Sequence, residues 1–273
     1  MCRLLAFAAR SPRTVEQAIG GADLASFGDL SPRHPDGWGM AWWPDHGAVG
    51  GERPPERVRA LGGARDDPAF HRAMRANAGT ASIVHLRGAT PGLTIGLRNC
   101  HPFVRNRAAF AQNGALYPQE RLLELLPPEL EAQVEGSTDS ERLFLLLHER
   151  AIASVEPFAE VVRHVLAEVL ETYSSPVLNM MYLSPDALHV VNAHDPTVIP
   201  YPGDPHDIFA LRYRVEDDLV VVASSGFDQP ESRGWKTLDN MTTLTIDLAT
   251  LDLRIDALIG VPALIFDESK ETA

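Results

Sequence analysis

Apolar residues in this chain fall into short continuous runs and into stripes with a spacing of three or four residues. A short apolar run bounded by Gly, Pro or charged residues predicts a buried strand, and a stripe predicts an amphipathic helix. The runs predict strands over residues 4–8, 37–43, 81–86, 108–112, 177–183, 187–192, 208–214, 219–224, 242–247 and 251–255. The stripes and start signals predict helices after Ser11 and Pro12, over 66–74, over 121–126, over 139–150 and over 157–173.

These elements come in the order strands, then a block of helices, then strands again. Such an order favours an α+β fold in which helices pack on sheets. The stripe within residues 157–173 is interpreted as a surface that faces the core. No Pro- or Ser-rich linker divides the chain, so residues 1–273 are predicted to form a single domain.

Composition narrows the classes of partner. The chain has 273 residues, of which 45% are hydrophobic and 22% charged, and its formal net charge is -13. That charge argues against a nucleic-acid partner or an anionic membrane surface, because both need an excess of Lys and Arg. No apolar run approaches the roughly 20 residues of a membrane span, and the apolar stretch before Arg10 is too short for a signal peptide. We expect a cytoplasmic protein.

The two cysteines, Cys2 and Cys100, are too few for a disulfide framework. Cys2 is the candidate nucleophile. Removal of Met1 gives Cys2 a primary amine beside its own thiol, and an α-amino group titrates at about 7.7–8.0. Such an amine can serve as the base that a thiol nucleophile needs at neutral pH. The alternative is an N-terminal cysteine without a chemical role.

The first five residues, Met-Cys-Arg-Leu-Leu, resemble the start of the class II glutamine amidotransferases, which belong to the N-terminal nucleophile hydrolases. Four later segments are similar to motifs of the same family in the same order. They are His-Pro-Asp-Gly-Trp-Gly at 34–39, Val-His-Leu-Arg-Gly-Ala-Thr at 84–90, Ala-Gln-Asn-Gly at 111–114 and Gly-Ser-Thr-Asp-Ser-Glu at 136–141. The resemblance implies a substrate that is glutamine or a γ-glutamyl amide.

By this resemblance three residues bind the substrate. Arg87 matches the residue that clamps the α-carboxylate, and a guanidinium can pair with a carboxylate through two hydrogen bonds. Thr90 adds a hydroxyl to the same carboxylate, and Asp139 matches the residue that holds the α-ammonium. Read from the residues alone, Arg87 also suits a structural ion pair, Thr90 a turn, and Asp139 a charge interaction at a helix N-terminus.

The same resemblance places the oxyanion hole at Asn113 and Gly114, through the Asn113 side-chain amide and the Gly114 backbone N–H. Asn-Gly is also a common turn dipeptide. The motif that contains Trp38 and Gly39 matches the family's early Gly-aromatic-Gly strand, and these two residues are possible pocket residues. His101 is a further possible pocket residue, with a structural hydrogen-bonded histidine as the alternative.

Other segments refine the resemblance. Cys100 is interpreted as a buried or pocket-wall cysteine. The sequence after Arg87 lacks the Trp and His that synthase relatives often carry near the corresponding Thr. The C-terminal half, with Ser224 and Trp235, is similar to compact YafJ-like members and to the γ-glutamyl hydrolase of the ergothioneine pathway. Ser224 and Trp235 are expected to be a strand end and a core residue rather than substrate contacts.

The resemblance implies a four-layer αββα fold of two stacked antiparallel sheets between helices. It implies acyl transfer through a γ-glutamyl thioester on Cys2, with no cofactor and no metal. The leaving amine is not specified: the protein is expected to hydrolyse a γ-glutamyl amide, to deliver ammonia to a separate synthase subunit, or to bind glutamine without catalysis. Specificity is expected from the loops over 45–55 and 228–235.

Overall fold

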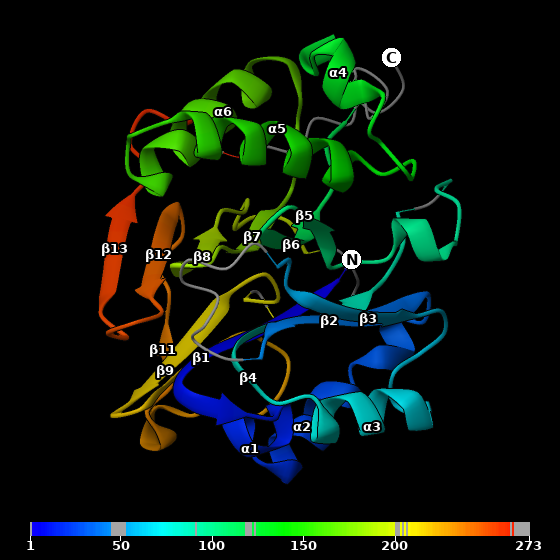
Figure 1. The fold of residues 1–273 in the computed structure, drawn as a ribbon, viewed down its shortest axis with the longest axis vertical. Coiled ribbons are helices and arrows are strands. Elements are labelled where there is room, and N and C mark those ends of the chain that lie inside the picture. Colours follow the sequence, from blue (N-terminus) through cyan, green and yellow to red (C-terminus); the bar gives the residue numbers. More distant parts are fainter. Residues whose placement is uncertain are drawn as a thin grey trace.

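Two antiparallel sheets stack face to face, and helices cover the outer face of each (Figure 1). The computed structural model describes residues 2–44, 53–90, 92–117, 122, 124–199, 203, 205, 207–262 and 264. The first sheet has seven strands in the order β11-β9-β10-β1-β4-β2-β3, and the second has six in the order β13-β12-β8-β7-β6-β5. The predicted α+β arrangement of four layers is therefore confirmed.

The strands of the first sheet are β1 (Arg3–Arg13), β2 (Gly37–Trp43), β3 (Glu56–Ala60), β4 (Gly79–Arg87), β9 (Leu211–Glu216), β10 (Leu219–Ser224) and β11 (Lys236–Thr237). Those of the second are β5 (Phe103–Arg105), β6 (Ala108–Gly114), β7 (Leu178–Leu183), β8 (Ala187–Asn192), β12 (Thr242–Asp247) and β13 (Leu253–Ala257). The helices are α1 (Val15–Ile19), α2 (Gly21–Gly28), α3 (Pro68–Ala76), α4 (Pro128–Glu131), α5 (Asp139–Ala153) and α6 (Phe158–Thr172).

The position of β1 explains why its sequence is apolar on both sides. It lies in the middle of its sheet, between β4 and β10. Leu4 and Ala6 face the second sheet, while Leu5 and Phe7 face the layer of α1, α2 and α3. A strand that is covered on both faces reads as a continuous apolar run, because successive side chains point to opposite faces.

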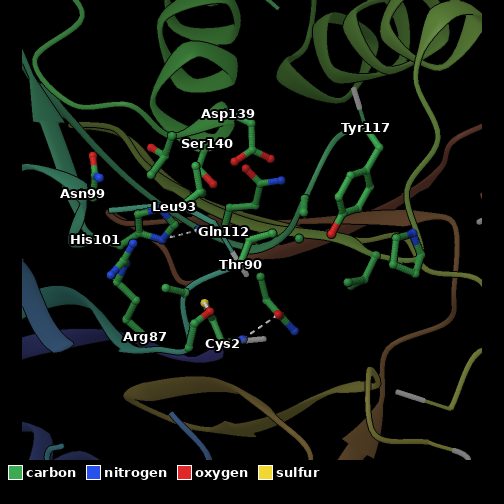
Figure 2. Close-up of a pocket in the computed structure, with 18 residues that line it drawn as sticks. Cys2, Arg87, Thr90, Leu93, Asn99, His101, Gln112, Tyr117, Asp139 and Ser140 are labelled. Atoms are coloured by element: carbon green, nitrogen blue, oxygen red, sulfur yellow. Dashed lines mark hydrogen bonds between the residues drawn. The ribbon is translucent and has the colours of Figure 1, made fainter. Parts of the chain in front are cut away.

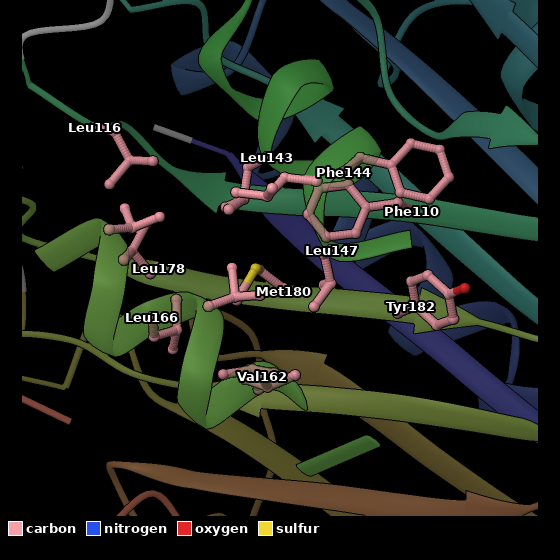
Figure 3. Packing of buried hydrophobic residues seen from close by; sticks show 14 of the residues in the cluster. Phe110, Leu116, Leu143, Phe144, Leu147, Val162, Leu166, Leu178, Met180 and Tyr182 are labelled. Atoms are coloured by element: carbon pink, nitrogen blue, oxygen red, sulfur yellow. The ribbon is translucent and has the colours of Figure 1, made fainter. Parts of the chain in front are cut away.

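The second outer layer rests on α5 and α6. Their apolar stripes pack on the second sheet, where Phe110 stacks on Phe144 with ring centroids 5.2 Å apart (Figure 3). The expected core-facing surface of α6 is buried there, including Val162 and Leu166. This packing holds α5 in place, and the first residue of α5 is Asp139.

The expected helix start at Ser11 and Pro12 is wrong. Strand β1 continues through Arg13, and α1 begins two residues after it at Val15. Thr14 is the N-cap, and it forms a capping box with Gln17. A capping box satisfies two backbone N–H groups at the start of a helix, so the helix begins after Thr14 and not after the Ser-Pro pair.

Short edge elements differ most from the sequence expectation. The polar strand β3, the three-residue β5 and helix α2 were not expected, and β9 and β13 each lie two or three residues later than predicted. Parts of the expected helix over 121–126 and of the loop over 45–55 lie outside the described residues. Among the helices that the structure describes, none is long and apolar enough to cross a bilayer.

Candidate active site

Four chain segments meet at one end of the stacked sheets and enclose a pocket of about 200 Å³. Cys2 precedes β1, Arg87 ends β4, Gly114 ends β6, and Asp139 begins α5. Figure 2 shows these side chains around the hollow, with Arg87 and His101 to one side of Cys2 and Tyr117 to the other. The described residues that line it are Cys2, Arg87, Gly88, Ala89, Thr90, Leu93, Asn99, His101, Gln112, Asn113, Gly114, Ala115, Tyr117, Thr138, Asp139, Ser140, Pro176 and Val177.

Hydrogen bonds of Cys2 and of the nearby residue Leu4 in β1 hold Cys2 in place. The Leu4 N–H donates to the Ser224 hydroxyl at 3.0 Å, and the Cys2 backbone nitrogen donates to Asn113 Oδ1 at 2.8 Å. The thiol donates to the Gly88 carbonyl at 3.5 Å, and the Cys2 residue is 9% exposed. The sequence-predicted nucleophile therefore lies on the floor of the pocket, with its own backbone nitrogen fixed by Asn113.

Asn113 presents a free donor beside Cys2. Its Oδ1 is used by the Cys2 nitrogen, whereas its Nδ2 is buried and has no hydrogen-bond partner among the described residues. A buried donor without a partner is costly, so this N–H is available to an acceptor atom that enters the pocket. Gly114 follows, where a Cβ would lie 2.3 Å from the Val177 carbonyl oxygen. The two residues lie in strand β6 rather than in a turn.

Arg87 presents a free donor at the other side of Cys2. The residue is buried, its Nη2 donates weakly to the Thr94 carbonyl at 3.5 Å, and its buried Nη1 has no partner in the described part of the chain. Asp36 anchors the loop that follows, because its Oδ2 accepts from the Ala89 N–H at 2.7 Å. Arg87 therefore does not form the structural ion pair that was one interpretation of it.

Asp139 supplies the opposite charge. Its carboxylate accepts from the Leu116 N–H at 2.8 Å, and Thr138 caps the helix that Asp139 begins. Burial raises the pKa of Asp139 to about 6, against the lowering effect of the Leu116 hydrogen bond. A buried carboxylate of this kind is stabilised by a cation that enters the pocket. Arg87 and Asp139 thus place a cation and a carboxyl group in the same pocket.

The hydrogen bonds of His101 define its tautomer. His101 Nδ1 accepts from the Gln112 N–H at 3.3 Å, so the hydrogen of the neutral ring is on Nε2. His85 Nε2, 3.0 Å from the same Nδ1 and 3.2 Å from the Gln112 carbonyl, must then be a donor. Burial, and secondarily the Arg87 and Arg59 charges, lower the pKa of His101 to about 3. His101 therefore lines the pocket as a neutral N–H donor.

The remaining predicted residues have different positions. Thr90 lines the pocket. Trp38 does not: it is buried in the outer core, where its Nε1 donates to Asp67 at 2.7 Å. Gly39 lies behind the pocket wall, where a Cβ would be 2.2 Å from the His101 carbonyl oxygen, so glycine lets the 101–102 segment approach. Trp235 is a buried core residue, and Cys100 is buried without lining the pocket.

One wall of the pocket was missed at the sequence level. Ala115, Tyr117, Pro176 and Val177 form this wall, and none of them carries a charge. Tyr117 and Ser174 form an isolated β-bridge, which brings the segment after β6 next to the segment before β7. The signal that could have located this wall is that its residues lie next to the ends of two paired strands, where Gly114 pairs with Leu178.

The pocket combines groups of different chemistry. A cation site, an anion site, a thiol and an unpartnered amide donor converge on a volume of about 200 Å³. Among the residues that the structure describes, no group of three or more His, Cys, Asp or Glu side chains is arranged to hold a metal ion.

Solved structures of low sequence identity share the fold. A glutamine aminotransferase class-II domain protein from Silicibacter pomeroyi is 19% identical with a TM-score of 0.62, and the match covers 94% of this chain and 100% of that one. Glutamine phosphoribosylpyrophosphate amidotransferase from B. subtilis is 17% identical with a TM-score of 0.59, and the match covers 95% of this chain and 50% of that one. A predicted glutamine amidotransferase from Pseudomonas aeruginosa is 20% identical with a TM-score of 0.53, covering 92% and 99%.

Sequence comparison gives the family. No curated protein matches the chain. The family model of the class-II glutamine amidotransferases, however, matches residues 1–195, a range that includes Cys2, Arg87, Asn113 and Asp139. Because that range covers most of the sequence, the chain belongs to the class-II glutamine amidotransferases.

Proposed function

We propose that this protein hydrolyses a γ-glutamyl amide with Cys2 as the nucleophile. The family as a whole acts in glutamine amide hydrolysis and ammonia transfer. The observation that carries the finer proposal is the double use of Asn113. One amide atom binds the Cys2 backbone nitrogen, and the other is a buried donor without a partner in the described part of the chain.

The two ends of the amino-acid head fit the two charges. The substrate α-carboxylate binds Arg87 Nη1, with His101 Nε2–H and the Thr90 hydroxyl as further donors. The α-ammonium binds Asp139. With both ends fixed, the side chain extends toward Cys2 and presents its γ-carbonyl to the thiol, which turns an encounter into a positioned reaction.

The reaction is an acyl transfer in two steps. The Cys2 α-amine, free after removal of Met1, accepts the thiol proton, and the thiolate forms a bond to the γ-carbon. Asn113 Nδ2–H and the Gly114 N–H stabilise the oxyanion. The intermediate collapses by breaking the C–N bond, and the protonated α-amine of Cys2 gives its proton to the leaving amine. Water then attacks the thioester and releases glutamate and the thiol.

The uncharged wall favours a leaving amine larger than ammonia. Beyond Cys2 the pocket continues along Ala115, Tyr117, Pro176 and Val177. An apolar or aromatic amine would bury surface against these side chains, at about 25 cal/mol for each Å² removed from water. Ammonia would leave that surface uncovered. We therefore favour a stand-alone γ-glutamyl hydrolase over a glutaminase that serves a separate synthase.

The test is to measure glutamate release from glutamine and from γ-glutamyl anilide with the same enzyme preparation. We expect release from both substrates and a kcat/KM for the anilide at least about tenfold higher, with Cys2→Ala inactive on both. Equal activity of wild type and Cys2→Ala would contradict the assigned nucleophile. Activity on glutamine alone, increased by a co-purifying synthase, would support ammonia delivery instead.

A further inference from the structure

A second hollow lies where one edge of each sheet meets the loop before α5. Strand β3 is the edge of the first sheet, and β5 is the edge of the second. The hollow has a volume of about 70 Å³. A single water needs roughly 10–15 Å³ by the same kind of measure, so the space holds a small ion and its contacts. Its described lining is Arg57, Arg59, Phe103, Val104, Arg105, Gln133, Glu135, Glu141, Phe144 and Leu145.

Three arginines meet in this hollow. Arg57 and Arg59 are two residues apart on β3, so their side chains leave the same face of the strand. Arg105 comes from β5 on the other sheet. Arg59 Nη1 donates to the Cys100 carbonyl at 2.7 Å, and Arg105 Nη2 donates to Gln133 Oε1. Arg105 Nε is buried and has no partner among the described residues.

These guanidinium groups lack counter-charges in contact. In the part of the chain that the structure describes, none of the three forms an ion pair, although ten other ion pairs between arginine and carboxylate are present. Glu135 and Glu141 line the same hollow. The Glu141 carboxylate, however, already accepts from the Glu135 and Gly136 N–H groups at 2.9 and 2.7 Å. Two carboxylates therefore face three guanidinium groups, and one of the two is already engaged by backbone N–H groups.

The arrangement is unfavourable in the empty protein. Partial burial lowers the pKa of Arg59 and of the more exposed Arg57, and the Arg57 charge lowers the pKa of Arg59 further. Glu135 acts in the opposite direction on both, and Glu141 does so on Arg59. Burial and the neighbouring positive charge disfavour the charged forms, and arginine stays charged at neutral pH. The chain has a formal net charge of -13, yet among the described residues no carboxylate forms an ion pair with these three arginines.

We infer that the arginine hollow formed by Arg57, Arg59 and Arg105 binds a small tetrahedral oxyanion of the phosphate class. Guanidinium groups bind such anions through paired, charge-assisted hydrogen bonds, and three of them surround a dianion from both sheets. The volume suits a compact group and not a whole nucleotide. The competing explanation is that charges on β3 and β5 only prevent edge-to-edge pairing of sheets, in which case no anion binds.

The test is calorimetric titration of the full chain with inorganic phosphate at constant ionic strength and saturating glutamate, which occupies Arg87. We expect one saturable site in the wild type. In the double variant Arg57→Gln, Arg105→Gln we expect at least about tenfold weaker binding, because two charged donors are lost. The charge-matched control, Arg163→Gln with Arg254→Gln, removes two arginines from ion pairs elsewhere on the chain, and its affinity should stay within about twofold of wild type.

Two further arms identify the source of the anion. If methyl phosphate binds as tightly as inorganic phosphate, the natural ligand is a phosphomonoester group. If methyl phosphate binds much more weakly, the natural ligand is the free phosphate ion. Acetate should bind more weakly than both. Circular dichroism confirms that the double variant is folded. The inference is overturned if the wild type shows no saturable phosphate binding, or if the control pair loses as much affinity as the Arg57 and Arg105 pair.

Discussion

The pocket around Cys2 has a charged end and an uncharged end, and they differ in how they are built. At the charged end, Arg87, His101 and Asp139 are held in place by backbone hydrogen bonds from neighbouring strands and loops. At the uncharged end, an isolated bridge joins Tyr117 to Ser174, and a second one joins Val177 to His194. On the proposed function, the charged end binds the glutamyl group, whereas the uncharged end selects the amine.

The largest effect is expected where the two ends meet. Asn113→Asp keeps an oxygen to accept from the Cys2 nitrogen but replaces the Nδ2 donor. Loss of one oxyanion donor typically lowers kcat by about 10²–10³. We expect that decrease for glutamine and for γ-glutamyl anilide alike, measured as steady-state glutamate release. A kcat within about threefold of wild type would show that Nδ2 does not face the developing charge.

A smaller effect is expected at the charged end. Arg87→Gln removes the partner of the α-carboxylate, and a hydrogen bond to a charged group contributes about 1.5–3 kcal/mol. We expect KM to rise by about 10–100-fold for both substrates, with a much smaller change in kcat. Arg98→Gln, an exposed arginine close in sequence, is the control and should change neither value. A rise in KM for only one substrate would contradict a shared glutamyl site.

The pH dependence at the charged end follows from Asp139. Its pKa is raised to about 6 in the free protein, so below pH 6 the carboxyl is protonated and no longer attracts the α-ammonium. We expect kcat/KM to fall with decreasing pH through this value, by up to about tenfold per pH unit. Asp139→Asn should raise KM and remove this dependence. An acid limb that persists in Asp139→Asn would assign it to another group.

The smallest effect is expected at the uncharged end. Tyr117→Ala removes an aromatic wall and should raise KM for γ-glutamyl anilide by about 5–20-fold, since a buried aromatic contact contributes about 1–2 kcal/mol. Kinetics with glutamine should not change, because its amide nitrogen does not reach that wall. Equal effects on both substrates would mean that Tyr117 supports the fold of the pocket and does not select the amine.

The sequence was most informative where a strand is buried on both faces. Strands β2, β8, β10 and β12 have the predicted bounds. In β2, β8 and β10 every residue is buried, so the largely apolar sequence ends where the chain leaves the sheet. The edge strands β3 and β5 were missed, since an edge carries polar and charged residues such as Arg57 and Arg105. The helix expected after Ser11 begins later because Thr14, just beyond the strand, is the N-cap residue and forms a capping box with Gln17.

For the site, the sequence motifs located Cys2, Arg87, Asn113 and Asp139, and the structure brings these four residues together. Trp38 shares a motif with Gly39, but its indole points to Asp67 on the other side of the sheet. Strand alternation explains this result, because a motif on one strand supplies side chains to both faces. The wall of Tyr117, Pro176 and Val177 depends on pairing between distant segments, which a local pattern does not encode.

The nucleophile is tested most directly by intact-protein mass after brief incubation with 6-diazo-5-oxo-norleucine, a glutamine analogue that alkylates such thiols. Wild type, Cys2→Ala and the matched control Cys100→Ala are compared. We expect a chain without Met1 that gains one adduct in the wild type and in Cys100→Ala, and none in Cys2→Ala. A wild-type chain that retains Met1 and gains no adduct would contradict this expectation and would favour a protein that binds glutamine without catalysis.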